Sequence, residues 1–597
     1  MKKRSEIAEE YKWDLSDYAI SAEDCLQKAE AIQKSLDKFK EFENNLKDEE
    51  NIFKCLELES KISKELIKIG IYADSKFNED TSNDIYAELM SKVEAALSEA
   101  SLATSFINVE IGKLSILTLK KLEQNPLHPN FSNYFKEIIR NKKYILSDKE
   151  EAILSQMGNF AGGFKANLTF YESSDIKFKP AKDSEGKNHE VTQTTYEKLL
   201  SSNDPVLREN VYKSLNGEFA NLENTLANNY ASHVKMISTF TKIRGYDSVL
   251  QAELYADNLS TKLYDLLIKK VKENACIFQN ALNAKQQALG LEKMKISDTY
   301  ADVGKEYDKE ISFDNAFETI KLTLKPFGEE YIKVFDLSKA QKWIDFCENQ
   351  NKRTGAYETC AYGCHPLVFM QFTNDISSTF TIAHELGHAI HSYFSNKTQP
   401  YEKSDYPIFV AEVASTVNET LLSLHLINNA QTIEEKAYYQ NQFLDQARAT
   451  ILGQTLFAEF EKLVFEKYDL DKALSKKFFQ ETYENLTKEY YGNNIEILPE
   501  TKYAYSRIPH FFRQFYVYKY ATGMLSALLI VKKFMDKEDG IQDKYIKFLS
   551  SGSSLTPLET LKIVGVDLEK EETFDEAFEF LNWVEKDFEN SVNNLKK

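Results

Sequence analysis

The stretch TIAHELGHAIHS, residues 381–392, concentrates side chains that can bind a metal ion and move a proton. His384, Glu385 and His388 match the pattern H-E-x-x-H. On a helix the two histidines lie one turn apart on the same face, so both imidazoles can reach one ion. The glutamate next to the first histidine then faces a water molecule at that ion. This spacing predicts a site for one Zn²⁺ per chain, with Glu385 as the catalytic base and acid.

The residues around the motif favour a metal site over the alternative, which is a surface helix with two solvated histidines. The helix is predicted to begin near Ser377 and Ser378, directly after the strand-like run PLVFMQF. The edge of that strand could also hold an extended peptide through its backbone. Apolar residues on the helix can anchor it in a core, at Ala383, Leu386, Ala389 and Ile390.

The third zinc ligand does not follow from the known extensions of the motif. The extension H-E-x-x-H-x-x-G-x-x-H requires glycine at 391 and histidine at 394, but the chain has His391 and Phe394. Spacings typical of zinc aminopeptidases and thermolysin-like enzymes place a glutamate at 407 or 408, where the chain has Pro407 and Ile408. His391 lies one turn beyond His388, but a further ligand would close the site to water. A structural or supporting role is therefore predicted for His391.

Three downstream glutamates remain as candidates, Glu402, Glu412 and Glu419. Glu402 lies in the polar loop KTQPYEKSDYP, which is a poor platform for a rigid ligand. The segment FVAEVASTVNETLLSLHL predicts an amphipathic helix, in which an acid needs a partner such as a metal ion. We predict Glu412 as the third ligand and Glu419 as a group that holds a ligand histidine. The alternative for Glu419 is an exposed helix acid.

The six cysteines predict neither a disulfide framework nor a second metal site. They are few for 597 residues and mostly scattered, which favours reduced thiols and a cytoplasmic location. Cys360, Cys364 and His365 form C-x-x-x-C-H, a separate zinc alternative. We disfavour it because no second ligand pair lies nearby.

Composition excludes several classes of partner. Lys plus Arg is 74 and Asp plus Glu is 93, so the net charge of −19 argues against nucleic acid and anionic membranes. The chain has no run of about 20 apolar residues, and its basic first residues are not followed by the apolar stretch of a secretory signal. Only 20 glycines and 11 prolines occur, which predicts a mostly helical protein.

The elements that must position the motif are therefore helices, interrupted at a few places. Residues 21 to about 118 read as long amphipathic helices, and a helical hairpin on the same chain is favoured over a coiled-coil partner. A small hairpin is expected near residues 175–192, beginning with Ile176 and Phe178. Asn203 or Asp204 then caps a new helix that has Pro205 in its first turn. We place a lobe boundary near residue 200, which separates an N-terminal helical lobe, 1–200, from a catalytic region, 201–597.

Several longer blocks resemble the oligoendopeptidase F group of the thimet oligopeptidase-like zinc metallopeptidases. They occur in the family's order over nearly the whole chain, which is far more specific than H-E-x-x-H alone. The blocks are YKWDLSDYA, GAYETCAYGCHPLVFMQF, HELGHAIHSYFS, FVAEVASTVNE, IPHFFRQFYVYKYATG and SGSSLTPLETLKIVGVDL.

The resemblance implies a mainly α fold. It would be a two-lobed helical ellipsoid with a deep substrate channel and a small β-sheet next to the zinc-binding helix. It also implies His384, His388 and Glu412 as zinc ligands and Glu385 as the catalytic acid and base, in agreement with the spacing argument. The implied substrates are short unstructured peptides, because a channel of that kind excludes folded proteins.

The block IPHFFRQFYVYKYATG resembles the part of the thimet relatives that contacts substrate and oxyanion through a histidine and tyrosines. His510 matches the histidine. The tyrosine is less defined, because the block lacks internal glycines and offers Tyr516, Tyr518 and Tyr520. We prefer Tyr516 and Tyr520, which would lie one helical turn apart, although some of these aromatics are expected to pack in a core. A hydrogen-bond donor at this position would stabilise the negative charge of a tetrahedral intermediate.

The sequence thus predicts a cytoplasmic zinc metalloendopeptidase whose partners are short peptides, without nucleic acid or membrane. One alternative is a zinc carboxypeptidase with the same H-E-x-x-H chemistry, which would need a group that captures a substrate terminus. A second alternative is a non-catalytic helical peptide-binding protein with an accidental motif. Residue preferences around the cleaved bond and the oligomeric state do not follow from the sequence.

Overall fold

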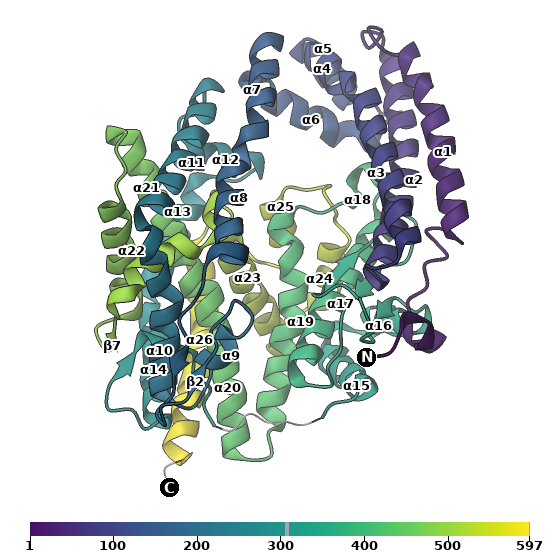
Figure 1. Cartoon of the computed structure of the whole chain (residues 1–597). Coiled ribbons are helices and arrows are strands. Elements are labelled where there is room, and N and C mark those ends of the chain that lie inside the picture. Colours follow the sequence, from purple (N-terminus) through teal and green to yellow (C-terminus); the bar gives the residue numbers. More distant parts are fainter. Residues whose placement is uncertain (305–309, 596–597) are drawn as a thin grey trace. The chain divides into compact units, whose positions relative to one another are not determined.

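Helices dominate the computed structural model, which describes residues 1–304 and 310–595 (Figure 1). They account for 72% of the residues, and no described strand is longer than three residues. The prediction of a mainly α protein is confirmed, and its physical basis is the scarcity of helix-breaking residues. Within the described residues, no single helix has the length and apolar character of a membrane span. Only the bent pair Asp84–Gly112 and Ile116–Glu123 meets these criteria jointly.

The elements form two compact units, each assembled from three separate segments of the chain. Unit 1 contains Met1–Lys143, Asp308–Leu422 and Lys533–Gly565, and unit 2 contains Tyr144–Tyr307, Ser423–Lys532 and Val566–Lys597. The lobe boundary predicted near residue 200 falls inside the first segment of unit 2. The predicted lobes, 1–200 and 201–597, therefore do not coincide with the two compact units. The division into these lobes stays a prediction.

Unit 1 contains the predicted N-terminal helices and the H-E-x-x-H segment. Its helices are α1 (Ala22–Leu36), α2 (Glu49–Glu79), α3 (Asp84–Thr104), α4 (Phe106–Gly112), α5 (Ile116–Glu123), α6 (Ser132–Asn141), α15 (Phe313–Leu324), α16 (Glu329–Ala340), α17 (Ile376–Thr398), α18 (Tyr401–Ser404), α24 (Ile541–Leu549) and α25 (Pro557–Ile563). Two longer helices, α19 (Ile408–Asn429) and α23 (Tyr518–Met535), have residues assigned to both units.

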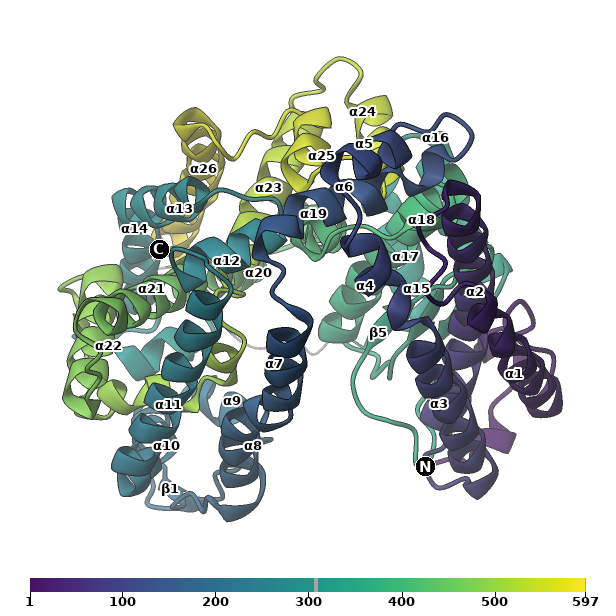
Figure 2. The same ribbon diagram turned by 90° about the horizontal axis from the view of Figure 1, so that it is seen from above.

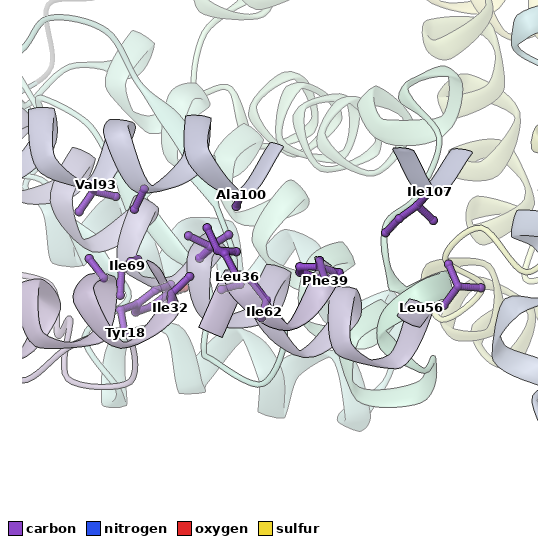
Figure 3. Close-up of a cluster of buried hydrophobic side chains, with 14 of the residues drawn as sticks. Tyr18, Ile32, Leu36, Phe39, Leu56, Ile62, Ile69, Val93, Ala100 and Ile107 are labelled. Atoms are coloured by element: carbon purple, nitrogen blue, oxygen red, sulfur yellow. The ribbon is translucent and has the colours of Figure 1, made fainter. Parts of the chain in front are cut away.

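The first three helices lie side by side, as both views show (Figures 1 and 2). The amphipathic helices predicted from residue 21 onward do bury apolar side chains, among them Ala29, Ile32, Leu36 and Phe39. Ile69 of α2 and Val93 of α3 belong to the same cluster (Figure 3). The predicted packing of these helices on their own chain is confirmed. Leu367 and Phe369, on the strand before the H-E-x-x-H helix, join the same core, so the N-terminal helices support that helix.

A three-stranded sheet precedes α17 in unit 1. Its strands are β4 (Ile344–Asp345), β5 (Tyr357–Thr359) and β6 (Leu367–Phe369), in the order β4-β6-β5. β6 pairs in parallel with β4 and antiparallel with β5, and β5 and β6 pack against α17. The predicted small sheet next to the helix is present. The expectation that PLVFMQF provides a free strand edge is wrong, because β6 is the central strand and its backbone groups bond on both sides.

Unit 2 holds the remaining elements. Its helices are α7 (Asp148–Ala161), α8 (Gly163–Phe170), α9 (Tyr196–Leu200), α10 (Pro205–Gly217), α11 (Glu223–Ile243), α12 (Val249–Ala256), α13 (Thr261–Glu273), α14 (Ala275–Ala288), α20 (Ile433–Ala447), α21 (Gln454–Asp471), α22 (Lys476–Tyr491) and α26 (Glu571–Leu595). Its strands are β1 (Ala181–Lys182) with β2 (Asn188–His189), and β3 (Met294–Lys295) with β7 (Ile495–Glu496).

Two local predictions in unit 2 can be compared with the structure directly. The hairpin expected at 175–192 is present as β1 and β2, but its strands begin at Ala181, later than the alternation at Ile176 and Phe178 indicated. Those two side chains instead pack partly buried against neighbouring cores. Asp204 caps α10 as predicted, since its carboxylate accepts hydrogen bonds from the amides of Val206 and Leu207.

Candidate metal centre

The helix that carries H-E-x-x-H begins sharply after the sheet. Asp375 is its N-cap, and the Asp375 carboxylate accepts hydrogen bonds from the Ser378 amide at 2.7 Å and hydroxyl at 2.8 Å. These bonds satisfy one of the amides that a helix start leaves without an internal partner. The apolar residues of α17 that the sequence assigned to a core are all buried, at Ala383, Leu386, Ala389 and Ile390. The helix is therefore a fixed support for its polar side chains.

Three polar side chains from α17 and α19 converge in unit 1. The Nε2 atoms of His384 and His388 lie 3.1 Å apart. Oε2 of Glu412 lies 3.6 Å from Nε2 of His384 and 3.4 Å from Nε2 of His388. Ligands about 2.0–2.1 Å from a tetrahedral Zn²⁺ stand roughly 3.3 Å from one another. The spacing of the three donor atoms thus fits one tetrahedral ion.

Among the described residues, this is the one group of three or more His, Cys, Asp or Glu side chains whose geometry could hold a metal ion. Cys360, Cys364 and His365 do not assemble into a second such group. His365 instead lies within hydrogen-bond distance of Asp17, with its Nδ1 2.8 Å from the Asp17 carboxylate. The Cys364 thiol donates to the Asp17 carbonyl oxygen. Among the described residues, the disfavoured alternative of a C-x-x-x-C-H zinc site is therefore not formed.

Gly387, inside the motif, sets the separation of the two helices. A Cβ atom at this position would lie 2.6 Å from Cα of Ser415 and 2.9 Å from the carbonyl oxygen of Ala414. Both atoms belong to the backbone of α19, which cannot yield as a flexible side chain would. Glycine therefore lets α19 approach α17 closely enough for Glu412 to reach the two histidines.

Buried hydrogen bonds hold α19 in this position. The Asn418 side chain donates to the carbonyl oxygen of Ala383 in α17 at 3.0 Å. Its own amide oxygen accepts from the hydroxyl of Tyr331 in α16 at 3.1 Å. Because both contacts are buried, breaking one would leave an unsatisfied polar group in the core. They fix the register between the helix of the histidines and the helix of Glu412.

Glu419 makes the contact with a ligand histidine that the sequence predicts. Nδ1 of His384 donates to the Glu419 carboxylate at 2.8 Å, and the Glu419 side chain is only 15% exposed. The alternative of a freely exposed helix acid is therefore wrong. This bond places the ring proton on Nδ1 and leaves Nε2 free to bind an ion.

The electrostatics of the group favour positive charge. Burial alone would lower the pKa of His384, but its hydrogen bond to Glu419 and the nearby carboxylates raise it to about 9. Burial alone would raise the pKa of Glu412, but the bond and charge of His388, followed by the charge of His384, lower it to about 2. The carboxylates that stabilise a proton on His384 would also stabilise a divalent cation, and Glu412 is in the ionised form that can bind one.

Glu385 is buried on α17, with only 7% of its surface exposed. Burial raises its pKa above the ordinary value, while the charges of His384 and His388 act in the opposite direction. A carboxyl whose pKa is raised towards the working pH is better suited to accept and return a proton. This is the property that the predicted role of Glu385 requires.

His391 contributes to packing and does not join the ligand group. Its ring stacks on Tyr406 with a centroid distance of 3.7 Å and an angle of 4°. The side chain is buried, and neither ring nitrogen has a hydrogen-bond partner in the described part of the chain. Burial and the charge of His388 lower its pKa to about 3, so the ring is neutral. The predicted structural role agrees with these contacts.

Glu358 is a nearby acid that the sequence reasoning missed. It lies on β5, which packs against α17, and its Oε1 atom is buried without a hydrogen-bond partner among the described residues. Burial is the main cause that raises its pKa to about 7, with His388 acting in the opposite direction. The only signal in the sequence was an acid within the run AYETC, 26 residues before His384.

The predicted substrate-contacting residues His510, Tyr516 and Tyr520 belong to unit 2. His510 is exposed, and the Tyr520 ring meets its ring edge-on at 6.1 Å. Tyr516 and Tyr520 are half-buried and in edge contact at 5.4 Å, although Tyr516 precedes α23 and does not lie one turn below Tyr520 on a helix. Tyr518 is fully buried. These exposures favour Tyr516 and Tyr520 over Tyr518 as groups that can meet a substrate.

Family profiles match most of the chain. The profile described as Peptidase family M3 matches residues 198–580, which include α17 and α19. A second profile, described as Oligopeptidase F, matches residues 110–178.

Individual proteins are similar over nearly the full length. Oligopeptidase PepF of Bacillus subtilis strain 168 is 30% identical over 580 residues, which cover 96% of this chain and 86% of PepF. A crystal structure of a protein from Chlamydophila abortus matches with a TM-score of 0.92 and 30% identity, over 99% of this chain and 100% of that one. Oligoendopeptidase-F from Enterococcus faecium matches with a TM-score of 0.73 and 25% identity, over 95% and 98% of the two chains. The similarity is thus not confined to the metal motif.

Proposed function

This chain belongs to peptidase family M3, and from that premise we propose that it is a zinc-dependent endopeptidase of short, unstructured oligopeptides. The single observation that carries the metal assignment is the triangle of His384, His388 and Glu412, whose donor atoms lie within 4.8 Å of one another. Two imidazoles and one carboxylate form a ligand set of catalytic zinc, and they leave a coordination position for water.

The protein groups would divide the work as follows. His384, His388 and Glu412 hold the metal, and Glu419 keeps the His384 ring oriented through its 2.8 Å hydrogen bond. When bound, zinc supplies Lewis acidity, which acidifies a water molecule and makes a peptide carbonyl more electrophilic. Glu385 accepts the proton of the attacking water and later delivers it to the leaving amine.

We further propose that His510 and either Tyr516 or Tyr520 donate hydrogen bonds to the oxygen of the tetrahedral intermediate. Although the His510 side chain is exposed, its neighbours partly desolvate the ring, and this effect, followed by the charges of Lys165 and Arg513, lowers its pKa and favours the neutral ring. A neutral imidazole can still donate through its N–H, and a tyrosine hydroxyl donates without a change of charge. Such donors stabilise the negative charge that develops as the carbonyl is attacked.

The substrate class follows from the family and from the chemistry. The similar proteins from B. subtilis and E. faecium are named as an oligopeptidase and an oligoendopeptidase. A scissile bond must also reach Glu385 and the two histidines as extended backbone, which a short unstructured peptide offers. We therefore propose internal cleavage of such peptides as the reaction.

The proposal is tested with an internally quenched peptide whose two ends are chemically blocked. The purified protein should cleave it at internal bonds, as identified by mass spectrometry of the products, and metal analysis should find one zinc per chain. Survival of the blocked peptide together with stepwise trimming of a free-ended peptide would show a carboxypeptidase instead. Absence of stoichiometric zinc and of any cleavage would leave a peptide-binding protein.

We also propose that the enzyme works in the cytoplasm. All six cysteines are free thiols, which suits a reducing compartment. Fractionation of the producing cells, with a tagged chain and marker proteins for each compartment, tests this location.

A further inference from the structure

Glu461, on α21 of unit 2, is a fully buried acid outside the metal centre. Its Oε1 atom accepts a hydrogen bond from the backbone amide of Phe515 at 3.1 Å. Its Oε2 atom is buried and has no hydrogen-bond partner within the described residues. Burial of a carboxyl group is costly, so a simple packing position would be filled better by an apolar side chain. Among the described residues, the hydrogen bond to Phe515 is the one that can give this buried acid a role.

Phe515, the donor in that contact, has an unusual backbone conformation. Its φ angle is +49°, in the left-handed region that bulky residues rarely adopt because it is sterically strained. The ring is buried between aromatic neighbours, with centroids 5.7 Å from Tyr264 and 5.1 Å from Phe465. Such a conformation persists only where its surroundings hold it. The hydrogen bond to Glu461 and the aromatic pocket are those surroundings.

The strained residue lies between the two parts of the chain that carry the proposed oxyanion donors. His510 stands five residues before it, and the His510 carbonyl oxygen accepts from the Arg513 amide at 2.8 Å. Tyr516 follows directly, with the Arg513 guanidinium 3.7 Å from its ring centroid. Tyr516 contacts Tyr520 edge-on, and Tyr520 contacts His510 in the same way. A rotation at Phe515 would thus move Tyr516 and Tyr520 relative to His510.

A second, half-buried acid holds the neighbouring residue. The Gln514 side chain donates to the Glu253 carboxylate of α12 at 2.8 Å. Burial raises the pKa of both Glu253 and Glu461, and the charge of Glu253 raises the pKa of Glu461 further. Two consecutive residues of the turn, Gln514 and Phe515, are therefore hydrogen-bonded to acids on neighbouring helices. Of these two bonds, only the one to Glu461 reaches the backbone and constrains φ directly.

We propose that Glu461 is a positioning residue for the peptidase reaction: its hydrogen bond to the Phe515 amide holds the strained turn that orients Tyr516 and Tyr520 against His510. This inference rests on the proposed function of that histidine and those tyrosines. Glu461 itself touches neither substrate nor metal in this role. Its neutral form would be enough, because only an acceptor oxygen is needed.

The test compares three variants of the full-length zinc enzyme on the blocked quenched peptide. Glu461→Leu removes the acceptor and should lower kcat by about 10- to 100-fold, because a misplacement of about 1 Å can cost that much. KM and zinc content should change little. Glu461→Gln keeps an acceptor oxygen without charge and should restore kcat to within about threefold of the wild type, since a neutral acceptor is sufficient.

Glu459→Leu is the matched control on the same helix. Glu459 accepts from the Tyr490 hydroxyl at 2.7 Å and pairs with Lys272 at 3.0 Å, so its loss also removes polar contacts of α21. It should lower the melting temperature without lowering kcat. Equal kcat losses in Glu459→Leu and Glu461→Leu would overturn the proposal, because they would show a general effect of helix stability.

A double-mutant cycle with Tyr516→Phe,Tyr520→Phe connects Glu461 to the proposed donors. If Glu461 acts through these tyrosines, Glu461→Leu should reduce kcat far less in that background than in the wild type. Full additivity would contradict the proposal. If Glu461→Leu does not fold, Glu461→Asp replaces it, since it withdraws the acceptor by one methylene, and undiminished kcat in folded Glu461→Asp would overturn the inference. Failure of the wild type to cleave any peptide would instead contradict the proposed function itself.

Discussion

Nδ1 of His384 and the carboxylate of Glu419 are joined by a 2.8 Å hydrogen bond across two helices. The bond leaves Nε2 of His384 directed at the group that includes His388 and Glu412. The orientation of the proposed ligand His384 thus depends on Glu419, which lies seven residues after the proposed ligand Glu412 on the same helix. Removal of Glu419 should therefore affect metal binding at His384.

Glu419→Ala should weaken zinc binding by about 10- to 100-fold, because the His384 ring loses the partner that fixes its tautomer and direction. Competition of each purified variant with a chelator of known affinity measures the change. Glu419→Gln should lie between the wild type and Glu419→Ala, since the amide can accept the bond without charge. Unchanged affinity in Glu419→Ala would show that the contact does not support a ligand.

Glu412→Ala should lose more zinc affinity than Glu419→Ala, because it removes a proposed ligand rather than a support. Glu402→Ala is the control, since Glu402 is the downstream acid that the sequence argument rejected. Metal content after dialysis, measured by elemental analysis, should fall for Glu412→Ala and stay at the wild-type level for Glu402→Ala. The reverse result would assign the third ligand to Glu402.

Glu385→Gln should retain zinc and lose activity by about 10²- to 10⁴-fold, because the ligands remain while the group that moves the proton does not. Steady-state kinetics on the quenched peptide and metal analysis of the same sample separate the two properties. Near wild-type kcat in this variant would contradict the role of Glu385.

Gly387→Ala should push α17 and α19 apart, because the new methyl group would lie 2.6 Å from Cα of Ser415. Overpacking of this kind costs about 1–3 kcal/mol of unfolding free energy. It should also weaken zinc binding, since Glu412 retreats with α19. Gly158→Ala is the control: Gly158 is in helix α7 with nothing within 4 Å of an added Cβ, and the change should be neutral or stabilising.

These contacts show which parts of the site the sequence could predict. The spacing of His384 and His388 is a local property of one helix, and the apolar face of α19 left few positions for an acid. The role of Gly387 and the position of Glu358 near α17 depend on packing between segments that are separated in the sequence. Local sequence patterns do not report such packing. The same reason explains β6: it is central only because two residues at 344–345 pair with it. Short strands are defined by such partners more than by their own residues.

Acid should destabilise unit 2 through His233, a ring that is 3% exposed and whose pKa burial lowers to about 4. The unfolded chain binds a proton at this ring near its ordinary value of 6.5, whereas the folded chain does so only near 4. Stability from this group is therefore complete above pH 6.5 and declines as the pH falls towards 4, by at most about 3 kcal/mol. Denaturant midpoints at pH 7.5 and pH 5 measure the decline.

His233→Phe keeps an aromatic ring against Phe512 but cannot take up a proton. The difference between its midpoints at the two pH values should be smaller than that of the wild type. An equal difference would assign the acid sensitivity to other groups.

The core of unit 1 has a consequence for how the protein is made. Trp13 and Phe369 belong to one cluster and their rings lie 5.5 Å apart, and Arg4 pairs with Asp345. A ribosome delivers these partners more than 300 residues apart, so the first helices emerge long before the strands that complete their core. Until then their apolar faces are exposed on the nascent chain. The N-terminal segment is thus expected to need protection by chaperones during synthesis, and a fragment ending before residue 369 should aggregate when expressed alone.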